Sequence, residues 1–434
     1  RNMWSRMPLT RADVQTLHGM LRQMVRWAGK GRCWTSGVVG PRLRAENRDE
    51  AGMAKNRSIF EEVGSTEKQV AEAGVIDRGR GGARGAIRVW LMLLFALVVV
   101  MIAVGGLTRL TASGLSITEW RPFTGAIPPM NAADWDSEFA KYQAIDEFRI
   151  QNQWMELSDF KVIYWWEWGH RQLGRVLGVV WVIGFFWFLL RRKIPTGWTV
   201  PLRGLGVLGG LQGAIGWWMV ASGVTSGEGM VDVASYRLAT HLGLAFVILG
   251  FIAWFIYHMG RPERELMQAR RDKEAKLFSM STGLMHFAFL QILLGALVAG
   301  IDAGRSYTDW PLMGGQVFPA SAFIFEPWWR NLFESPGLVQ FIHRVSGYLL
   351  AIFAVVVWLR GRRSAHPNTR FAFNAVMAAM ALQIALGIVT VLYGAPWQVA
   401  ILHQFLAVVL WALILRARFL AGYPLATSIR GTPA

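Results

Sequence analysis

The sequence predicts an all-α membrane protein with eight transmembrane helices in two pseudo-symmetric four-helix bundles. Three observations predict this fold class: 53% of the residues are hydrophobic, eight apolar stretches are long enough to span a bilayer, and the two halves of the chain repeat one another. A helix needs about 20 apolar residues to cross the roughly 30 Å of bilayer hydrocarbon. These stretches leave no sizeable soluble domain.

The eight predicted spans cover residues 87–107, 163–190, 202–221, 238–257, 278–301, 339–359, 371–393 and 399–415. Spans one to four form a first bundle (87–258), and spans five to eight form a second (278–418). A basic linker, 259–277, joins the bundles. Residues 1–86 and 419–434 are tails.

The distribution of charge predicts the topology. The net charge is +17, but basic residues are concentrated in three short connections, 191–203, 260–276 and 360–370, whereas the charged residues of the longer loops 109–161 and 302–337 are mostly acidic. By the positive-inside rule the basic connections face the cytoplasm or matrix, and so does the N-terminus. The positive charge is thereby explained without nucleic acid as a partner.

The N-terminal tail has two interpretations. Residues 1–44 are rich in arginine and contain one acid, Asp13, which is the bias of a mitochondrial transit peptide. Alternatively, Met53 starts a short tail of a bacterial inner-membrane protein, and residues 1–52 are an over-extended start. The single cysteine, Cys33, excludes an internal disulfide and covalent haem attachment of the Cys-x-x-Cys-His kind.

Short motifs recur in the same order in both halves. A His-Arg pair followed by glycine occurs at His170 and at His343. A Leu-Gln pair with glycine four residues after the glutamine occurs at Gln212, Gln291 and Gln383. Other repeated elements are Thr118-Glu119-Trp120 with Thr308-Asp309-Trp310, and Thr240-His241 with Leu402-His403. Because each half has an even number of spans, the halves enter the membrane in the same direction and are related by an axis along its normal.

Four of the eight histidines occupy corresponding positions in spans two, four, six and eight: His170, His241, His343 and His403. Each is expected within the first turns after an outer loop, so that all four lie at one depth. One such histidine is readily an interfacial polar residue, but four in register indicate a shared role. Paired imidazoles from facing helices of a bundle are the usual axial ligands of b-type haem.

Two further groups of side chains are predicted near these histidines. Haem propionates need cations, and arginine pairs well with carboxylates; the alternative is that the arginines reach for lipid headgroups. The candidate arginines are Arg171, Arg175, Arg237 and Arg344.

Glu167 breaks the symmetry of the repeat, because the second half has Gln340 at its place. A carboxylate within a span is costly and therefore a functional candidate. Chemistry on a haem in the first half alone is one explanation. A hydrogen bond that orients His170 or another polar group is the other.

Between residues 87 and 415 these motifs resemble haem A synthase. The resemblance is carried by Gly105-Gly106-Leu107-Thr108-Arg109-Leu110-Thr111, Ser113-Gly114-Leu115-Ser116, Glu167-x-x-His170-Arg171-x-x-Gly174-Arg175, Ala299-Gly300-x-Asp302-Ala303-Gly304 and Gln340-x-x-His343-Arg344. The lack of loop cysteines resembles the branch of the family shared by proteobacteria and mitochondria.

The resemblance implies an oxidoreductase that converts the methyl group of haem O into the formyl group of haem A for cytochrome oxidase assembly. It implies that His170 and His241 hold the substrate haem O, that His343 and His403 hold a resident haem B, and that Glu167 is the catalytic acidic residue. A haem O synthase is then the expected upstream partner.

Two other classes of protein stay open on the residues alone. A membrane-bound b-type cytochrome electron carrier uses the same histidine pairs but does not need the difference between Glu167 and Gln340. A transporter is expected to have interrupted helices and acids at the membrane midplane, which are not found here. The expected surroundings are membrane lipid and the bacterial inner membrane, with the mitochondrial inner membrane as the alternative; a homo-oligomer is left open, and the electron donor is not indicated.

Overall fold

The described part of the chain is helical, as the sequence predicts. The structure, a computed structural model, describes residues 81–225 and 229–426, all within one compact unit. These residues contain no β-strand and eight helices that are long and apolar enough to cross a membrane. The predictions for residues 1–52, among them the one for Cys33, and for residues 427–434 lie outside this described part.

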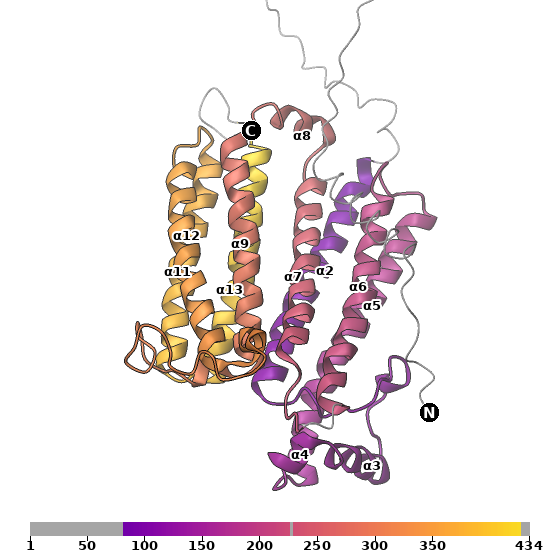
Figure 1. Cartoon of the computed structure of the whole chain (residues 1–434). Helices are drawn as coiled ribbons and strands as arrows, with labels where there is room; N and C mark the ends of the chain where they lie inside the picture. Colours follow the sequence, from indigo (N-terminus) through magenta and orange to yellow (C-terminus); the bar gives the residue numbers. More distant parts are fainter. Residues whose placement is uncertain (1–80, 226–228, 427–434) are drawn as a thin grey trace, which may run out of the picture. The chain divides into compact units, whose positions relative to one another are not determined.

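The eight long helices match the eight predicted spans one for one, and Figure 1 shows how they are arranged. They are α2 (Gly81–Leu110), α5 (Leu157–Leu190), α6 (Thr199–Val224), α7 (Ser235–Met259), α9 (Ala275–Gly300), α11 (Pro336–Gly361), α12 (Pro367–Leu392) and α13 (Trp397–Gly422). Short helices lie between them: α3 (Ala132–Gln143), α4 (Asp146–Ile150), α8 (Glu263–Ala269) and α10 (Asn331–Glu334).

Most helix ends lie a few residues beyond the predicted ones, because capping residues extend a helix past its apolar stretch. Helix α5 begins at Leu157 rather than at residue 163, since Glu156 and Asp159 form a capping box. In α11, the Ser335 side chain caps the first turn and Pro336 follows it. Helix α13 continues to Gly422, past the predicted boundary at 418.

The long helices form two rings of four. In the first ring α2 and α6 each lie beside both α5 and α7, so α5 and α7 are diagonally opposite. In the second ring α9 and α12 each lie beside both α11 and α13, which are likewise diagonal. The rings meet where α7 contacts α9 and where α13 contacts α2 and α7. Corresponding helices of the two bundles therefore occupy corresponding places in their rings, as the repeat predicts.

One ionic cluster ties the two bundles together. The Nη2 atom of Arg109, at the end of α2, lies 3.1 Å from Asp302 Oδ2 and 3.5 Å from Asp232 Oδ1. Asp302 follows α9 directly, so the cluster joins the ends of corresponding helices.

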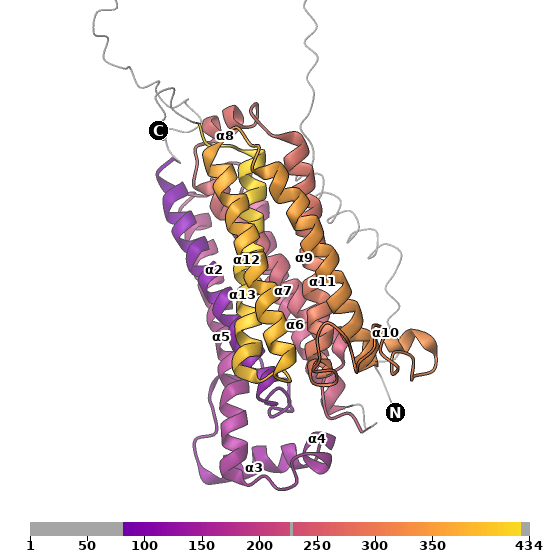
Figure 2. The same ribbon diagram turned by 90° about the vertical axis from the view of Figure 1, so that its left-hand side faces the viewer.

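The connections rich in lysine and arginine gather at one end, which we call the basic end: the start of α2, α8, and residues 191–198 and 360–366. Arg84 donates to the carbonyl oxygens of His258 and Arg261, and Arg261 donates to that of Tyr423. Figures 1 and 2 show α8 at this end and α3 and α4 at the opposite one.

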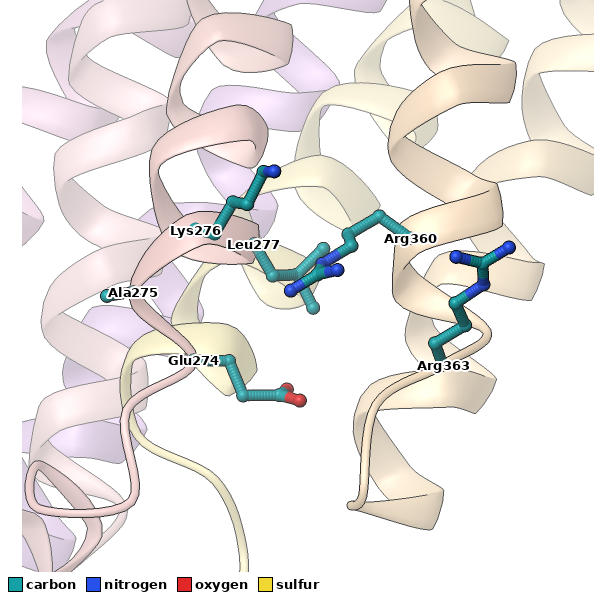
Figure 3. A pocket seen from close by; sticks show the side chains of 6 residues that line it. All are labelled: Glu274, Ala275, Lys276, Leu277, Arg360 and Arg363. Atoms are coloured by element: carbon teal, nitrogen blue, oxygen red, sulfur yellow. The ribbon is translucent and has the colours of Figure 1, made fainter.

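A cavity of about 230 Å³ lies at the basic end, between the start of α9 and the end of α11. Figure 3 shows Lys276, Arg360 and Arg363 around it together with Glu274. The Ser364 hydroxyl donates a hydrogen bond to Glu274 Oε2 at 2.8 Å. The cavity lies far along the helices from the four histidines, so it is not part of the predicted site.

The opposite end, which we call the loop end, comprises residues 111–156 and 301–335. In the first half α3 and α4 pack on the start of α5 through aromatic rings, including Tyr142 stacked on Phe160 at 5.3 Å between centroids. Glu147 of α4 is buried among them, 3% exposed. Burial, followed by the nearby charges of Asp232 and Glu167, raises the pKa of Glu147 to about 8.

This raised pKa makes stability dependent on pH. The folded protein keeps a proton on Glu147 that the unfolded chain releases near pH 4.5, so stability should fall as pH rises from about 4.5 to about 8. We expect Glu147→Gln to make that decline shallower by an amount on the order of 2 kcal/mol. Thermal unfolding in detergent at pH 5.5 and 8 measures this decline in stability. An equally steep decline in the variant would contradict the raised pKa of Glu147.

Candidate functional site

The four predicted histidines lie in corresponding places of the two rings. His170 and His241 are on the diagonal helices α5 and α7, and His343 and His403 are on the diagonal helices α11 and α13. In each ring the two histidines therefore come from helices that lie across the bundle from each other. The repeat thus brings the histidines together in the pairs that the sequence predicts.

One expectation about depth in the helix is wrong for His170. Three of the histidines follow the start of their helix by about two turns, but α5 begins at Leu157, roughly three and a half turns before His170. The extra turns of α5 carry the packing of α3 and α4, for which the second half has no counterpart of similar length.

A glycine of the neighbouring helix faces each imidazole. A Cβ atom on Gly216 or Gly387 would lie 2.9 Å from Cε1 of His241 or His403, and one on Gly295 would lie 3.1 Å from Cε1 of His343. On α2, a Cβ on Gly105 would lie 3.0 Å from Nε2 of His170. Side chains at these four places would crowd the rings, so the glycines keep room for the imidazoles.

A glutamine one turn before the glycine holds three of the four histidines. The Nε2 atom of Gln212 donates to the backbone carbonyl of His241 at 2.9 Å and lies 3.2 and 3.3 Å from its ring nitrogens. In the same way, Gln291 Nε2 donates to the backbone carbonyl of His343 at 2.9 Å. Gln383 Nε2 donates to the backbone carbonyl of His403 at 3.0 Å. The Leu-Gln motif found in the sequence therefore serves to hold histidine.

The sequence did not reveal a fourth copy of this motif, on α2, because methionine stands there in place of glutamine. Gly105 corresponds to the other three glycines, and the residue four positions before it is Met101. Within the described residues no hydrogen bond to the His170 imidazole is found. The only sequence signal was the spacing to Gly105.

The donor set fits haem iron. The described residues contain no group of three or more His, Cys, Asp or Glu side chains that could hold a bare metal ion, whereas a porphyrin supplies four ligands and needs two axial ones. A metal-bound imidazole donates its other N–H to an acceptor. The Oε1 atoms of Gln212 and Gln383 are buried without a partner, so each offers an acceptor beside its histidine.

Arg171 and Arg344 fasten the outer loops to the histidine helices in the same way. Arg171 donates to the carbonyl oxygens of Ile117 at 2.7 Å and Glu119 at 3.0 Å. Arg344 donates to those of Tyr307 at 2.8 Å and Asp309 at 2.9 Å. In both halves the carbonyls belong to the residue before the repeated Thr-Glu-Trp or Thr-Asp-Trp segment and to the middle residue of that segment. Both arginines therefore stabilise the same part of the outer loop.

Glu167 is buried, 3% exposed, and each of its oxygens has two donors. Oε2 accepts from Ser116 Oγ at 2.8 Å and from the Ile117 backbone N–H at 2.7 Å. Oε1 accepts from Arg171 Nε at 3.0 Å and Nη2 at 2.5 Å. The carboxylate thus joins the loop at residues 116–117 to the helix turn that carries His170.

Gln340, at the corresponding place, makes a weaker network. Its Nε2 donates to the Tyr307 carbonyl at 3.1 Å, and its Oε1 is buried without a partner. Of the two corresponding positions, only that of the first half therefore has a buried acidic side chain near its histidine.

The remaining two predicted arginines also bond to backbone carbonyls. Arg175 donates to Pro122 and Arg121 at 2.9 Å each, and Arg237 donates to Trp218 at 2.8 Å and stacks on its ring. A cavity of about 380 Å³ at the loop end is lined by Arg175, Arg171 and the ion-paired Arg121 and Lys141. The role of the four arginines towards propionates stays a prediction.

The ion pair between Arg171 and Glu167 predicts a difference between the halves in stability. Arg171→Met leaves a buried carboxylate unpaired, at a cost of about 3–5 kcal/mol. Arg344→Met loses only bonds to carbonyls, at about 1.5–3 kcal/mol. We expect the first variant to unfold at the lower temperature in detergent; equal melting temperatures would show that the pair contributes no more than the carbonyl bonds.

Comparison with known proteins adds sequence likeness to this geometry. Residues 88–415 match the model of a family of cytochrome oxidase assembly proteins. The haem A synthase of Roseobacter denitrificans is 73% identical over 382 residues, which are 88% of this chain and 100% of that protein. The haem A synthase of Paracoccus denitrificans is 62% identical over 378 residues, which are 87% of this chain and 99% of that protein.

Proposed function

The chain belongs to the haem A synthase family, and on that premise we propose how its two bundles share the reaction. The protein is a multi-pass membrane enzyme, an oxidoreductase that converts haem O to haem A for cytochrome oxidase assembly. The observation that carries the proposal is the pair of histidines on diagonal helices in each bundle, with a carboxylate beside only one pair.

The first bundle takes the substrate. His170 and His241 hold haem O between α5 and α7, and Glu167 is the acidic residue that takes part in the oxidation. In support, Glu167 lies one turn before His170 on the same helix, and its counterpart in the second bundle is the neutral Gln340.

The second bundle holds haem B between His343 and His403. Glutamine amides donate to the backbone carbonyls of both histidines. Firmly held ligands support the proposal that this haem stays bound. A haem bound there supplies one-electron redox chemistry.

Oxidation of the methyl group passes through an alcohol and then a hydrated aldehyde, which loses water to give the formyl group. The methyl group and one water together release four electrons and four protons as the formyl group forms, and dioxygen would be the oxidant that accepts them. Glu167 stabilises positive charge that develops beside the ring or accepts a proton, and Arg171, which donates to Oε1, holds the carboxyl group in place. The closed loop at residues 116–119 limits the access of water to this carboxylate.

The proposed setting is the inner membrane of a bacterium, with the basic end and the N-terminus inside. In support, the relatives are bacterial and the lysines and arginines gather at one end. A haem O synthase is the proposed upstream partner, since it makes the substrate.

Expression beside a haem O producer, followed by chromatography and mass identification of the extracted pigments, tests the proposal. We expect haem B together with haem O or haem A. Haem B alone would indicate an electron carrier, and extraction of no haem would exclude both functions.

A further inference from the structure

The replacement of glutamine by Met101 distinguishes one histidine from the other three. Gln212, Gln291 and Gln383 each donate to the backbone carbonyl of a histidine and lie against its ring. A thioether cannot donate a hydrogen bond. Met101 therefore cannot make these bonds to His170.

Met101 occupies the same place in its bundle as Gln291 does in the other. Gly174 follows His170 by four residues, and Gly347 follows His343 by four. A Cβ on Gly174 would lie 3.5 Å from Met101 Cε, and a Cβ on Gly347 would lie 3.3 Å from Gln291 Nε2. The two side chains thus approach the same turn of corresponding helices, and they differ in chemistry rather than in position.

The consequence is a difference in how firmly each imidazole is held. Partners outside the first coordination sphere fix the orientation of a ligating histidine and raise metal affinity. The second bundle has such a partner on both of its histidines, whereas the first bundle has one on His241 only.

We propose that Met101 leaves His170 as the weakly held ligand of the first bundle, so that haem exchanges there while the second bundle retains its haem. Met101 and the three glutamines are positioning residues, which act through the histidines. This inference rests on the proposed assignment of substrate haem to the first bundle. It explains why one fold repeated in a single chain can bind one haem as substrate and product and the other as a resident group.

The test is the rate at which purified protein in detergent transfers haem to an excess of apomyoglobin, with the haem types separated by chromatography. Met101→Gln should slow the release of haem O and haem A by about three- to tenfold, the effect of one added hydrogen bond, without changing the release of haem B. Met101→Leu, which stays apolar, should release all haems at the original rates. Gln291→Met is the mirror variant and should speed the release of haem B by a similar factor.

Equal release of haem O and haem A from Met101→Gln and Met101→Leu would overturn the inference, as would unchanged haem B release from Gln291→Met. His170→Ala distinguishes this failure from a failure of the proposed function. If His170→Ala removes haem O and haem A but Met101→Gln changes no rate, only the role of Met101 is wrong. If His170→Ala leaves the content of every haem unchanged, the assignment of substrate to the first bundle is wrong.

Discussion

Replacing His170 or His241 by alanine is expected to reduce the formation of haem A to background while haem B stays bound. The two imidazoles are the paired donors of the first bundle, on diagonal helices and facing Gly105 and Gly216, and no other histidine of the described chain lies in that ring near the loop end. Either substitution removes one of the two imidazoles that would hold the substrate haem, so the methyl group would no longer be held in place for oxidation. The measurement is haem A produced by membranes that also contain a haem O producer.

The mirror variants supply the matched control. His343→Ala and His403→Ala should lose haem B, seen as loss of its absorption after purification, while haem O remains extractable from the protein. A variant of the first pair that lost haem B and kept haem A formation would reverse the proposed roles of the bundles.

Replacing Glu167 by glutamine is expected to lower haem A formation by about 10²–10⁴-fold, the range for removing an acid–base group. Haem O or its alcohol should accumulate, and the spectrum of haem B should be retained. Glutamine has nearly the shape of glutamate and is the residue found at the corresponding position 340, so the second bundle shows that this fold tolerates it.

A purely structural role for Glu167 predicts a different result, because the carboxylate also ties residues 116–117 to α5. In that case the variant would lose protein yield and both haems together. Glu147→Gln, which removes the other buried carboxyl group of the loop end, controls for a general effect of losing a buried acidic residue there. Unchanged haem A formation in Glu167→Gln and Glu167→Ala would remove Glu167 from the reaction.

The eight helices were predictable because a bilayer imposes one length and one composition on every span. Their ends were less so, since residues such as Ser335 and the pair Glu156 and Asp159 continue a helix by capping, independently of hydropathy. The helices that carry the four histidines were predictable from the repeat, but the extra length of α5 before His170 was not.

The surroundings of the histidines were not predictable to the same degree. The Leu-Gln motifs were visible as repeats, but spacing along one helix does not say which neighbouring helix it faces. Met101 was hidden because the copy of the motif that contains it has lost its glutamine. The arginines were expected to pair with propionates. Their hydrogen bonds to backbone carbonyls, such as that of Ile117, could not be predicted, because irregular loops leave no periodic pattern in the sequence.

The central claim is that each bundle holds a haem between histidines of diagonal helices. The most direct measurement is the haem content per polypeptide of protein purified after expression with ample haem, for the unaltered chain and for His170→Ala and His343→Ala. The account predicts coloured protein from which each substitution removes a different haem. Colourless unaltered protein, or haem content that neither substitution changes, would contradict it.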